Sequence, residues 1–274
     1  MPGRASHRRA AVLGHPVDHS LSPVLHLAAY AALGLDWSYE RIDVTPEGLP
    51  TFLDSLDESW VGLSLTMPLK HDVLPLLDEI DPVAAATGAV NTVLVGDGVR
   101  RGTNTDVRGL VVSLDEHAAA RGDAVVLGGG ATARSAVAAL AARGSAQVTV
   151  YVRRPDSADA LRRTAADVGV SLVVRPWAEA GAGLGADVVL STVPRGVADG
   201  LAESVASGPG TLLDVVYDPW PTRLAGAWAA HGGEVASGLD LLLHQAVAQV
   251  RLMTGLDAPV EVLRAALAGA AAAR

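Results

Sequence analysis

One stretch constrains the fold more than any other: Ala124 to Ser135, which reads AVVLGGGATARS. A short apolar run leads into three glycines, and a helix-compatible stretch, residues 131–143, follows at once. Gly128, Gly130 and Ala133 match G-x-G-x-x-A. In that pattern the first glycine permits a tight turn, the second lets backbone approach a pyrophosphate, and the small third residue packs helix on strand. A Gly-rich turn can also be a plain loop, but strand before and helix after favour a dinucleotide site.

Composition narrows the class of protein. With 274 residues, half of them apolar, the chain can build two domains of ordinary size. It has no cysteine, which excludes disulfides and thiol catalysis, and no H-E-x-x-H or acidic cluster indicates a metal. The net charge of −9 disfavours nucleic acid as a partner. Because no apolar run reaches about 20 residues and no signal peptide is recognisable, we expect a soluble, cytoplasmic protein without a membrane partner.

The first hundred residues alternate between strand and helix patterns, which predicts a mostly parallel sheet. Two strand patterns, 88–95 and 99–105, flank Gly96-Asp97-Gly98, which predicts a hairpin with a primed turn. The expected strands before the hairpin are 8–14, 37–44 and 60–66, and the expected helices are 23–33, 47–56 and 68–77.

Several polar residues lie at loop positions of this first half. Ser22 precedes Pro23 and suits a helix N-cap, whereas Ser20 is not needed for a cap. The two hydroxyls could together hold a small carboxylate, and the residues alone leave both interpretations open. Lys70 falls at the edge where ligands of parallel sheets bind, although a lone lysine is usually a solvated charge. Asp106 could cap a helix beginning near Val107 or take part in catalysis.

The second half continues the alternation, with strands expected at 147–152, 170–174, 187–192 and 211–216, as in a doubly wound nucleotide domain. The end of its second strand bears on the cofactor. An NAD site usually has an acidic residue there, but this run reads Tyr151-Val152-Arg153-Arg154. Arginine suits a 2′-phosphate through its charge and forked donors, which predicts NADP; two solvated arginines are the alternative. Arg134 is a weaker candidate for the same phosphate, and Thr192 should border the nicotinamide side.

Taken together, several motifs resemble the shikimate dehydrogenase family over nearly the whole chain. They are Gly14-His15-Pro16-Val17, His19-Ser20-Leu21-Ser22-Pro23, Gly62-Leu63-Ser64-Leu65-Thr66-Met67-Pro68-Leu69-Lys70, Gly88-Ala89-Val90-Asn91-Thr92, Gly102-Thr103-Asn104-Thr105-Asp106, Asp214-Val215-Val216-Tyr217-Asp218-Pro219 and Gly238-Leu239-Asp240-Leu241-Leu242-Leu243-His244-Gln245-Ala246. Each motif alone is modest, whereas their joint order around a dinucleotide fingerprint is specific.

The resemblance implies an oxidoreductase that reversibly reduces 3-dehydroshikimate to shikimate with NADPH, a step of chorismate and aromatic amino acid biosynthesis. It implies a catalytic pair, Lys70 and Asp106. The chemistry needs such a pair because hydride delivery to a ketone leaves an alkoxide that a nearby proton donor stabilises. The substrate-binding residues that the resemblance implies are Ser20, Ser22, Ser64, Thr66, Asn91, Tyr217 and Gln245.

The resemblance also implies the domain plan. It gives two α/β domains: an N-terminal, mostly parallel-sheet substrate domain and a Rossmann-type NADP domain, with the C-terminal helices packing back on the first. The expected boundaries are 1–106 plus 239–274 for the first domain and 107–238 for the second. The expected cofactor-binding residues are Gly128, Gly129, Gly130, Ala131, Arg134, Arg153, Arg154, Thr192 and Gly238. The oligomeric state stays open, with a homodimer as one alternative.

Three positions depart from the family pattern. Ser64 and Val152 stand where the family commonly has Asn, and Leu27 stands where Asn often follows the motif histidine, here His26. Ser64 keeps a polar hydroxyl but is shorter than asparagine, so we expect one substrate contact to differ from that of the family. We expect His19, His26 and His244 to be structural residues. A quinate/shikimate dehydrogenase of relaxed specificity using NAD or NADP, and a non-catalytic NADP-binding relative, are the two alternatives.

Overall fold

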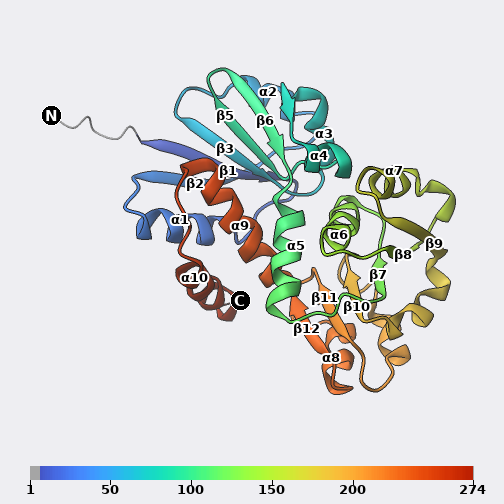
Figure 1. Cartoon of the computed structure of the whole chain (residues 1–274). Helices are drawn as coiled ribbons and strands as arrows, with labels where there is room; N and C mark the ends of the chain where they lie inside the picture. Colours follow the sequence, from blue (N-terminus) through green and yellow to red (C-terminus); the bar gives the residue numbers. More distant parts are fainter. Residues whose placement is uncertain (1–6, 274) are drawn as a thin grey trace. The chain divides into compact units, whose positions relative to one another are not determined.

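The computed structural model describes residues 7–273, which form two compact α/β units (Figure 1). Of the described residues, unit 1 contains 7–85, 89–105 and 243–273, and unit 2 contains 86–88 and 106–242. Each unit is built on one six-stranded sheet, as the predicted fold class requires. Within the described residues, no helix has the length and apolar character needed to cross a bilayer.

The sheet of unit 1 has the strand order β2-β1-β3-β5-β6-β4. Its strands are β1 (Arg8–Gly14), β2 (Trp37–Asp43), β3 (Trp60–Leu65), β4 (Glu79–Ile80), β5 (Thr92–Gly96) and β6 (Val99–Thr103). The pairs β1–β2, β1–β3 and β4–β6 are parallel, whereas β5 is antiparallel to both of its neighbours. Only β5 therefore runs against the others in this sheet, and the predicted mostly parallel sheet is confirmed.

The predicted hairpin joins β5 to β6 through a two-residue loop. Gly96 pairs with Val99, and the two residues between them, Asp97 and Gly98, have φ of 54° and 72°. Positive φ at both central residues is the requirement of a type I′ turn, which Asp-Gly meets at little cost.

The helices assigned to unit 1 are α1 (Ser22–Ala32), α2 (Leu49–Asp54), α3 (Leu69–Asp72), most of α4 (Pro82–Thr87), most of α9 (Gly238–Thr254) and α10 (Val260–Ala272). The expected helix over 68–77 is wrong in length. α3 ends at Asp72, and a 3-10 turn, Leu74–Leu76, follows. Pro75 is the physical reason, because it has no N–H to donate to the carbonyl of His71 and restricts Leu74 before it.

The sheet of unit 2 is parallel throughout, in the order β12-β11-β10-β7-β8-β9. Its strands are β7 (Ala124–Leu127), β8 (Gln147–Val152), β9 (Ser171–Pro176), β10 (Val188–Ser191), β11 (Thr211–Asp214) and β12 (Glu234–Ser237). Counted from β7, this order is the 3-2-1-4-5-6 of the Rossmann fold, with β7 and β10 at the topological switch point.

Side chains of β7 alternate between two cores, one on each face of this sheet. Val126 packs in a cluster with α6 (Ala131–Ala142), α7 (Asp159–Asp167) and α5 (Thr105–Glu116). Val125 and Leu127 pack on the opposite face in a cluster that includes Trp228 of α8 (Arg223–Ala230). All three strand residues are at most 4% exposed. Burial on both faces explains why this strand is continuously apolar instead of alternating.

Candidate active site

The glycine loop of unit 2 is held against the end of β10. Gly128 has a φ of 119°, and an added Cβ would lie 2.5 Å from Oγ1 of Thr192. The Thr192 hydroxyl donates to the carbonyl of Leu127 at 2.8 Å, and the Gly128 N–H donates to the carbonyl of Tyr151 at 3.0 Å. Gly128 is therefore required both by its backbone conformation and by the close approach of Thr192.

The next part of the loop leaves room at the start of α6. Gly130 is the N-cap residue of α6, its φ is −83°, and an added Cβ would meet no atom within 4 Å. Its residue type supplies no capping side chain, and no side-chain cap bond is present there among the described residues. Ala133 is fully buried under the helix. An uncapped helix N-terminus behind a glycine with open space beside it fits a bound pyrophosphate.

Three arginines of unit 2 are candidates for binding the 2′-phosphate. Arg153 and Arg154 directly follow β8, the strand beside β7, and both are exposed. Arg134, in the first turn of α6, donates from Nη2 to the carbonyl of Gly88 at 3.1 Å. Burial, and then the charge of Arg163, lower the pKa of Arg134 below its ordinary value. An anion would relieve the repulsion between the guanidinium groups of Arg134 and Arg163. No acidic residue stands in the Tyr151–Arg154 run.

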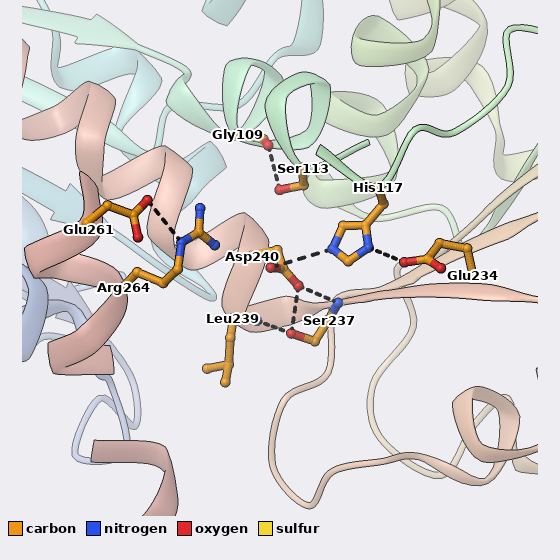
Figure 2. A network of polar contacts seen from close by, with 9 residues as sticks. All are labelled: Gly109, Ser113, His117, Glu234, Ser237, Leu239, Asp240, Glu261 and Arg264. Atoms are coloured by element: carbon orange, nitrogen blue, oxygen red, sulfur yellow. Dashed lines mark hydrogen bonds and ion pairs between the residues drawn. The ribbon is translucent and has the colours of Figure 1, made fainter. Parts of the chain in front are cut away.

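Gly238 begins α9 and allows a close backbone approach. An added Cβ would lie 2.1 Å from the carbonyl oxygen of Val215 and 3.2 Å from Cδ1 of Tyr217. Figure 2 shows the polar contacts around this helix start. Asp240 accepts hydrogen bonds from the N–H and the hydroxyl of Ser237 at 2.8 and 2.9 Å. His117 lies with Nδ1 2.7 Å from Glu234 and with Nε2 3.7 Å from Asp240 (Figure 2).

In unit 1, the ends of β1 and β3 bring the predicted substrate residues to one sheet edge. An added Cβ on Gly14 would lie 2.4 Å from Cγ2 of Thr66, so β1 ends in direct contact with that threonine. The N–H of Thr66 donates to the carbonyl of Leu13 at 2.9 Å. The carbonyl of Lys70 accepts from Val90 at 2.8 Å, which ties α3 to the segment before β5.

The two motif serines are buried and bonded to each other. Ser22 is the first residue of α1 and makes no side-chain cap, so the interpretation of Ser22 as the N-cap is wrong. The helix begins one position earlier than that interpretation requires. Ser20 instead accepts the N–H of Ser22, and the two hydroxyls are 3.3 Å apart. Ser20 is 9% exposed and Ser22 is 5% exposed.

Asn91 fixes the start of α5. Its Oδ1 accepts from the N–H of Thr105 at 2.8 Å, and its Nδ2 donates to the Thr105 hydroxyl at 2.9 Å. Because α5 begins at Thr105, Asp106 lies inside the first turn and is not the cap residue that the capping alternative requires. Asp106 is 5% exposed.

A buried hydrogen-bond network lies behind this edge, and the sequence did not predict it. The Ser64 hydroxyl accepts from the Tyr39 hydroxyl at 2.6 Å and donates to Oε1 of Gln249 at 2.9 Å. Burial raises the pKa of Tyr39, and the Ser64 hydrogen bond opposes that effect. The His26 ring stacks on Tyr39, with centroids 3.9 Å apart. One signal was available: Gln249 follows Gln245 by four residues, which places both on the same face of α9.

The predicted residues divide between the two units. Those of unit 1 are Ser20, Ser22, Ser64, Thr66, Lys70, Asn91 and Gln245, and those of unit 2 are Asp106, Gly128, Gly129, Gly130, Ala131, Arg134, Arg153, Arg154, Thr192, Tyr217 and Gly238. Unit 1 collects hydroxyl, amide and ammonium groups. Unit 2 collects glycines, a free helix start and guanidinium groups. Their roles as site residues remain predictions.

The two α/β units, one with the Rossmann strand order, and the family models that the chain matches define a dinucleotide-binding oxidoreductase. Residues 12–93 match the family model of the shikimate dehydrogenase substrate binding domain. Residues 238–268 match the shikimate 5′-dehydrogenase C-terminal domain, and residues 124–216 match the model described as NADP oxidoreductase coenzyme F420-dependent.

The chain belongs to the shikimate dehydrogenase family. It is 39% identical over 272 residues to the shikimate dehydrogenase (NADP(+)) of Moorella thermoacetica, covering 95% of this chain and 92% of that one. The solved shikimate dehydrogenase of Mycobacterium tuberculosis is 44% identical, with a TM-score of 0.89 and coverage of 96% and 99%. That of Thermus thermophilus, solved in complex with NADP(H) and shikimate, is 37% identical, with a TM-score of 0.85 and coverage of 96% and 99%.

Proposed function

We propose that the protein reversibly reduces 3-dehydroshikimate to shikimate with NADPH, a step of chorismate and aromatic amino acid biosynthesis. The observation that carries the proposal is the presence of Lys70 and Asp106 together, in the family's motifs, in a chain that belongs to this family over nearly its full length. A non-catalytic NADP-binding relative could keep the glycine loop and would have no need of this pair.

The cofactor is proposed to lie along the edge of unit 2. Gly128, Gly129, Gly130 and Ala131 lead into the uncapped start of α6, which suits the pyrophosphate. Arg153 and Arg154, with Arg134 as a weaker candidate, suit the 2′-phosphate, which supports NADP over NAD. Thr192 and Gly238 stand at strand ends where the nicotinamide side is expected. When bound, the nicotinamide supplies the hydride.

The substrate is proposed to lie at the edge of unit 1. Ser20 and Ser22 bind its carboxylate, helped by Tyr217 of unit 2. Polar groups of Ser64, Thr66, Asn91 and Gln245 surround the ring hydroxyls and the reacting carbonyl. Hydroxyl and amide groups suit this task because each can donate to, or accept from, a ring hydroxyl as required.

In the proposed catalytic pair, Lys70 transfers the proton to and from the substrate oxygen and Asp106 positions Lys70. When the carbonyl carbon takes up hydride, negative charge develops on its oxygen, and the Lys70 ammonium stabilises that charge and delivers a proton to it. In the reverse direction the same amine accepts the hydroxyl proton. Asp106 holds the ammonium in place, and its negative charge favours the protonated form of lysine.

A nicotinamide absorbance assay that crosses shikimate and quinate with NADP and NAD tests this function. Turnover of shikimate with NADP, well above the other three combinations, supports the proposal. Equal turnover of quinate, or preference for NAD, would favour the enzyme of relaxed specificity, whereas NADP binding without turnover of either acid would favour the non-catalytic relative. A solved quinate dehydrogenase of Corynebacterium glutamicum, in complex with NAD, is 31% identical with a TM-score of 0.87, so this crossing is required.

We also propose that the protein acts in the cytoplasm, which fractionation of the producing cell tests by following the dehydrogenase activity. Light scattering on the purified chain separates a monomer from the homodimer left open by the sequence.

A further inference from the structure

Gln249 is a fully buried side chain on α9 that makes four hydrogen bonds. Its Oε1 lies 2.9 Å from the Ser64 hydroxyl and 3.1 Å from Nε2 of His26. Its Nε2 donates to the Thr92 hydroxyl at 2.9 Å and to the carbonyl oxygen of Asn91 at 3.3 Å. Every polar atom of the amide is therefore used, and all of the partners belong to unit 1.

The partners fix the orientation of this amide. A backbone carbonyl can only accept, so the Gln249 atom that faces the carbonyl of Asn91 must be the nitrogen. The oxygen then faces Ser64 and His26, and both must donate to it. The His26 ring is thereby protonated on Nε2, and its Nδ1 is left to accept from Tyr30 at 3.2 Å.

This orientation sets the direction of the hydroxyl contacts on the β3 side. Because Ser64 must donate to Gln249, its contact with Tyr39 at 2.6 Å must be one in which Tyr39 donates. The only hydrogen of the Ser64 hydroxyl is thus committed. Ser64 can then meet a ligand only through an oxygen lone pair, which suits a ring hydroxyl that donates.

A second set of contacts leads from Gln249 to Asn91. Thr92 accepts from the Gln249 amide, so its own hydrogen is free to point at Oδ1 of Asn91, at 2.9 Å. The same Oδ1 accepts from the N–H of Thr105. The Asn91 amide is therefore held with its oxygen on the N–H of Thr105, which leaves its nitrogen to donate to the Thr105 hydroxyl at 2.9 Å.

We propose that Gln249 is a positioning residue for the dehydrogenase reaction. Its amide orients two of the proposed substrate-binding residues: Ser64 directly, by accepting its hydroxyl hydrogen, and the Asn91 side chain through Thr92. This inference rests on the proposed function, because it concerns the affinity for shikimate. Ser64 has a short side chain whose only hydrogen is committed to Gln249, so its hydroxyl depends on its neighbours for direction.

The first test compares Gln249→Met with the wild type. Methionine has similar length and no strong donor or acceptor, so both sets of contacts are lost. We expect the KM for shikimate to rise about tenfold, which is the size of one misdirected hydrogen bond, while the KM for NADP and kcat change less than about threefold. Thr254→Val is the matched control, since it removes a hydroxyl of α9 that donates to the carbonyl of Val250 and touches neither set of contacts.

The second test separates positioning from a merely structural role. Ser64→Ala should raise the KM for shikimate in the wild type. In Gln249→Met it should have little further effect, because a hydroxyl that Gln249 no longer directs contributes little to shikimate binding. Gln249→Glu keeps the acceptor that faces Ser64 and removes both donors to the Asn91 side, so its KM should lie between those of the wild type and the methionine variant. Its carboxylate would also lie beside His26, so NMR should show the pKa of His26 raised.

The proposal is overturned if Gln249→Met leaves the KM for shikimate within about twofold of wild type. It is equally overturned if KM and kcat change in parallel with a lowered melting temperature in both Gln249→Met and Thr254→Val, or if the effects of Ser64→Ala and Gln249→Met multiply. Wild-type turnover of shikimate in the same series tests the proposed function separately, because its absence would refute that function before any variant is compared.

Discussion

His26 allows a pH dependence of stability to be worked out from the structure. The ring is fully buried, and burial lowers its pKa from 6.5 to about 4, although the hydrogen bond with Gln249 acts in the opposite direction. The folded protein therefore holds this histidine neutral, whereas the unfolded chain binds a proton below about pH 6.5.

The sign and size of the effect follow from this difference. The contribution of His26 to the free energy of unfolding is complete above about pH 6.5, falls as the pH drops, and is lost near pH 4, where the folded state also binds the proton. At about 1.4 kcal/mol for each pKa unit, the loss is about 3 kcal/mol. That is a large part of the stability of an ordinary domain.

The assay compares the wild type with His26→Gln, whose amide can still donate to Gln249 and does not titrate. Hydrogen exchange of the α1 amides, followed from about pH 7 down to about pH 4.5 with intrinsic rates corrected, reports the opening of unit 1. We expect the wild type to lose about 2 to 3 kcal/mol more than the variant over this range. Parallel curves for the two proteins, or an NMR titration of His26 near its ordinary pKa, would refute the reasoning.

Four further outcomes are expected. Lys70→Ala should lower kcat by about 10²- to 10⁴-fold with little change in KM for shikimate, and near-normal turnover in steady-state assays would remove its catalytic role. Arg153→Ala should weaken NADP about tenfold or more while NAD is little affected, as measured by fluorescence titration; equal losses would contradict a phosphate contact. Gly130→Ala should keep the melting temperature, because the added methyl meets nothing, yet weaken NADPH binding; unchanged affinity would place the pyrophosphate elsewhere. Ser20→Ala and Ser22→Ala should each raise the KM for shikimate, and unchanged constants would speak against carboxylate binding.

The sequence predicts those parts of the fold that depend on local patterns. The apolar run before Gly128, the glycine spacing and the Asp97-Gly98 turn each express a backbone requirement that neighbouring residues satisfy, and the structure has the predicted elements there. The predicted length of the helix over 68–77 was wrong because apolar periodicity was given more weight than the helix-breaking effect of Pro75. The two-residue strand β4 is too short to show any period.

The polar network around Gln249 could not be predicted from local patterns, because its contacts join distant parts of the chain. His26 and Gln249 are separated by 223 positions, and Ser64 and Gln249 by 185. Nothing near His26 in the sequence reveals what its ring contacts, and so it could be described only as structural. The departure at Ser64 was visible in the sequence, but the residues that direct its hydroxyl were not.

Most of α9 and all of α10 belong to unit 1. The order in which the two units begin to be translated therefore differs from the order in which they can finish folding. Unit 2 is nearly continuous, so a ribosome releases almost all of it before the last thirty or so residues of unit 1 are made. Until then helix α1 and strands β3 and β5 lack Gln249, the hydrogen-bond partner of His26, Ser64 and Thr92. The half of the protein that is translated first is therefore the half that finishes folding last.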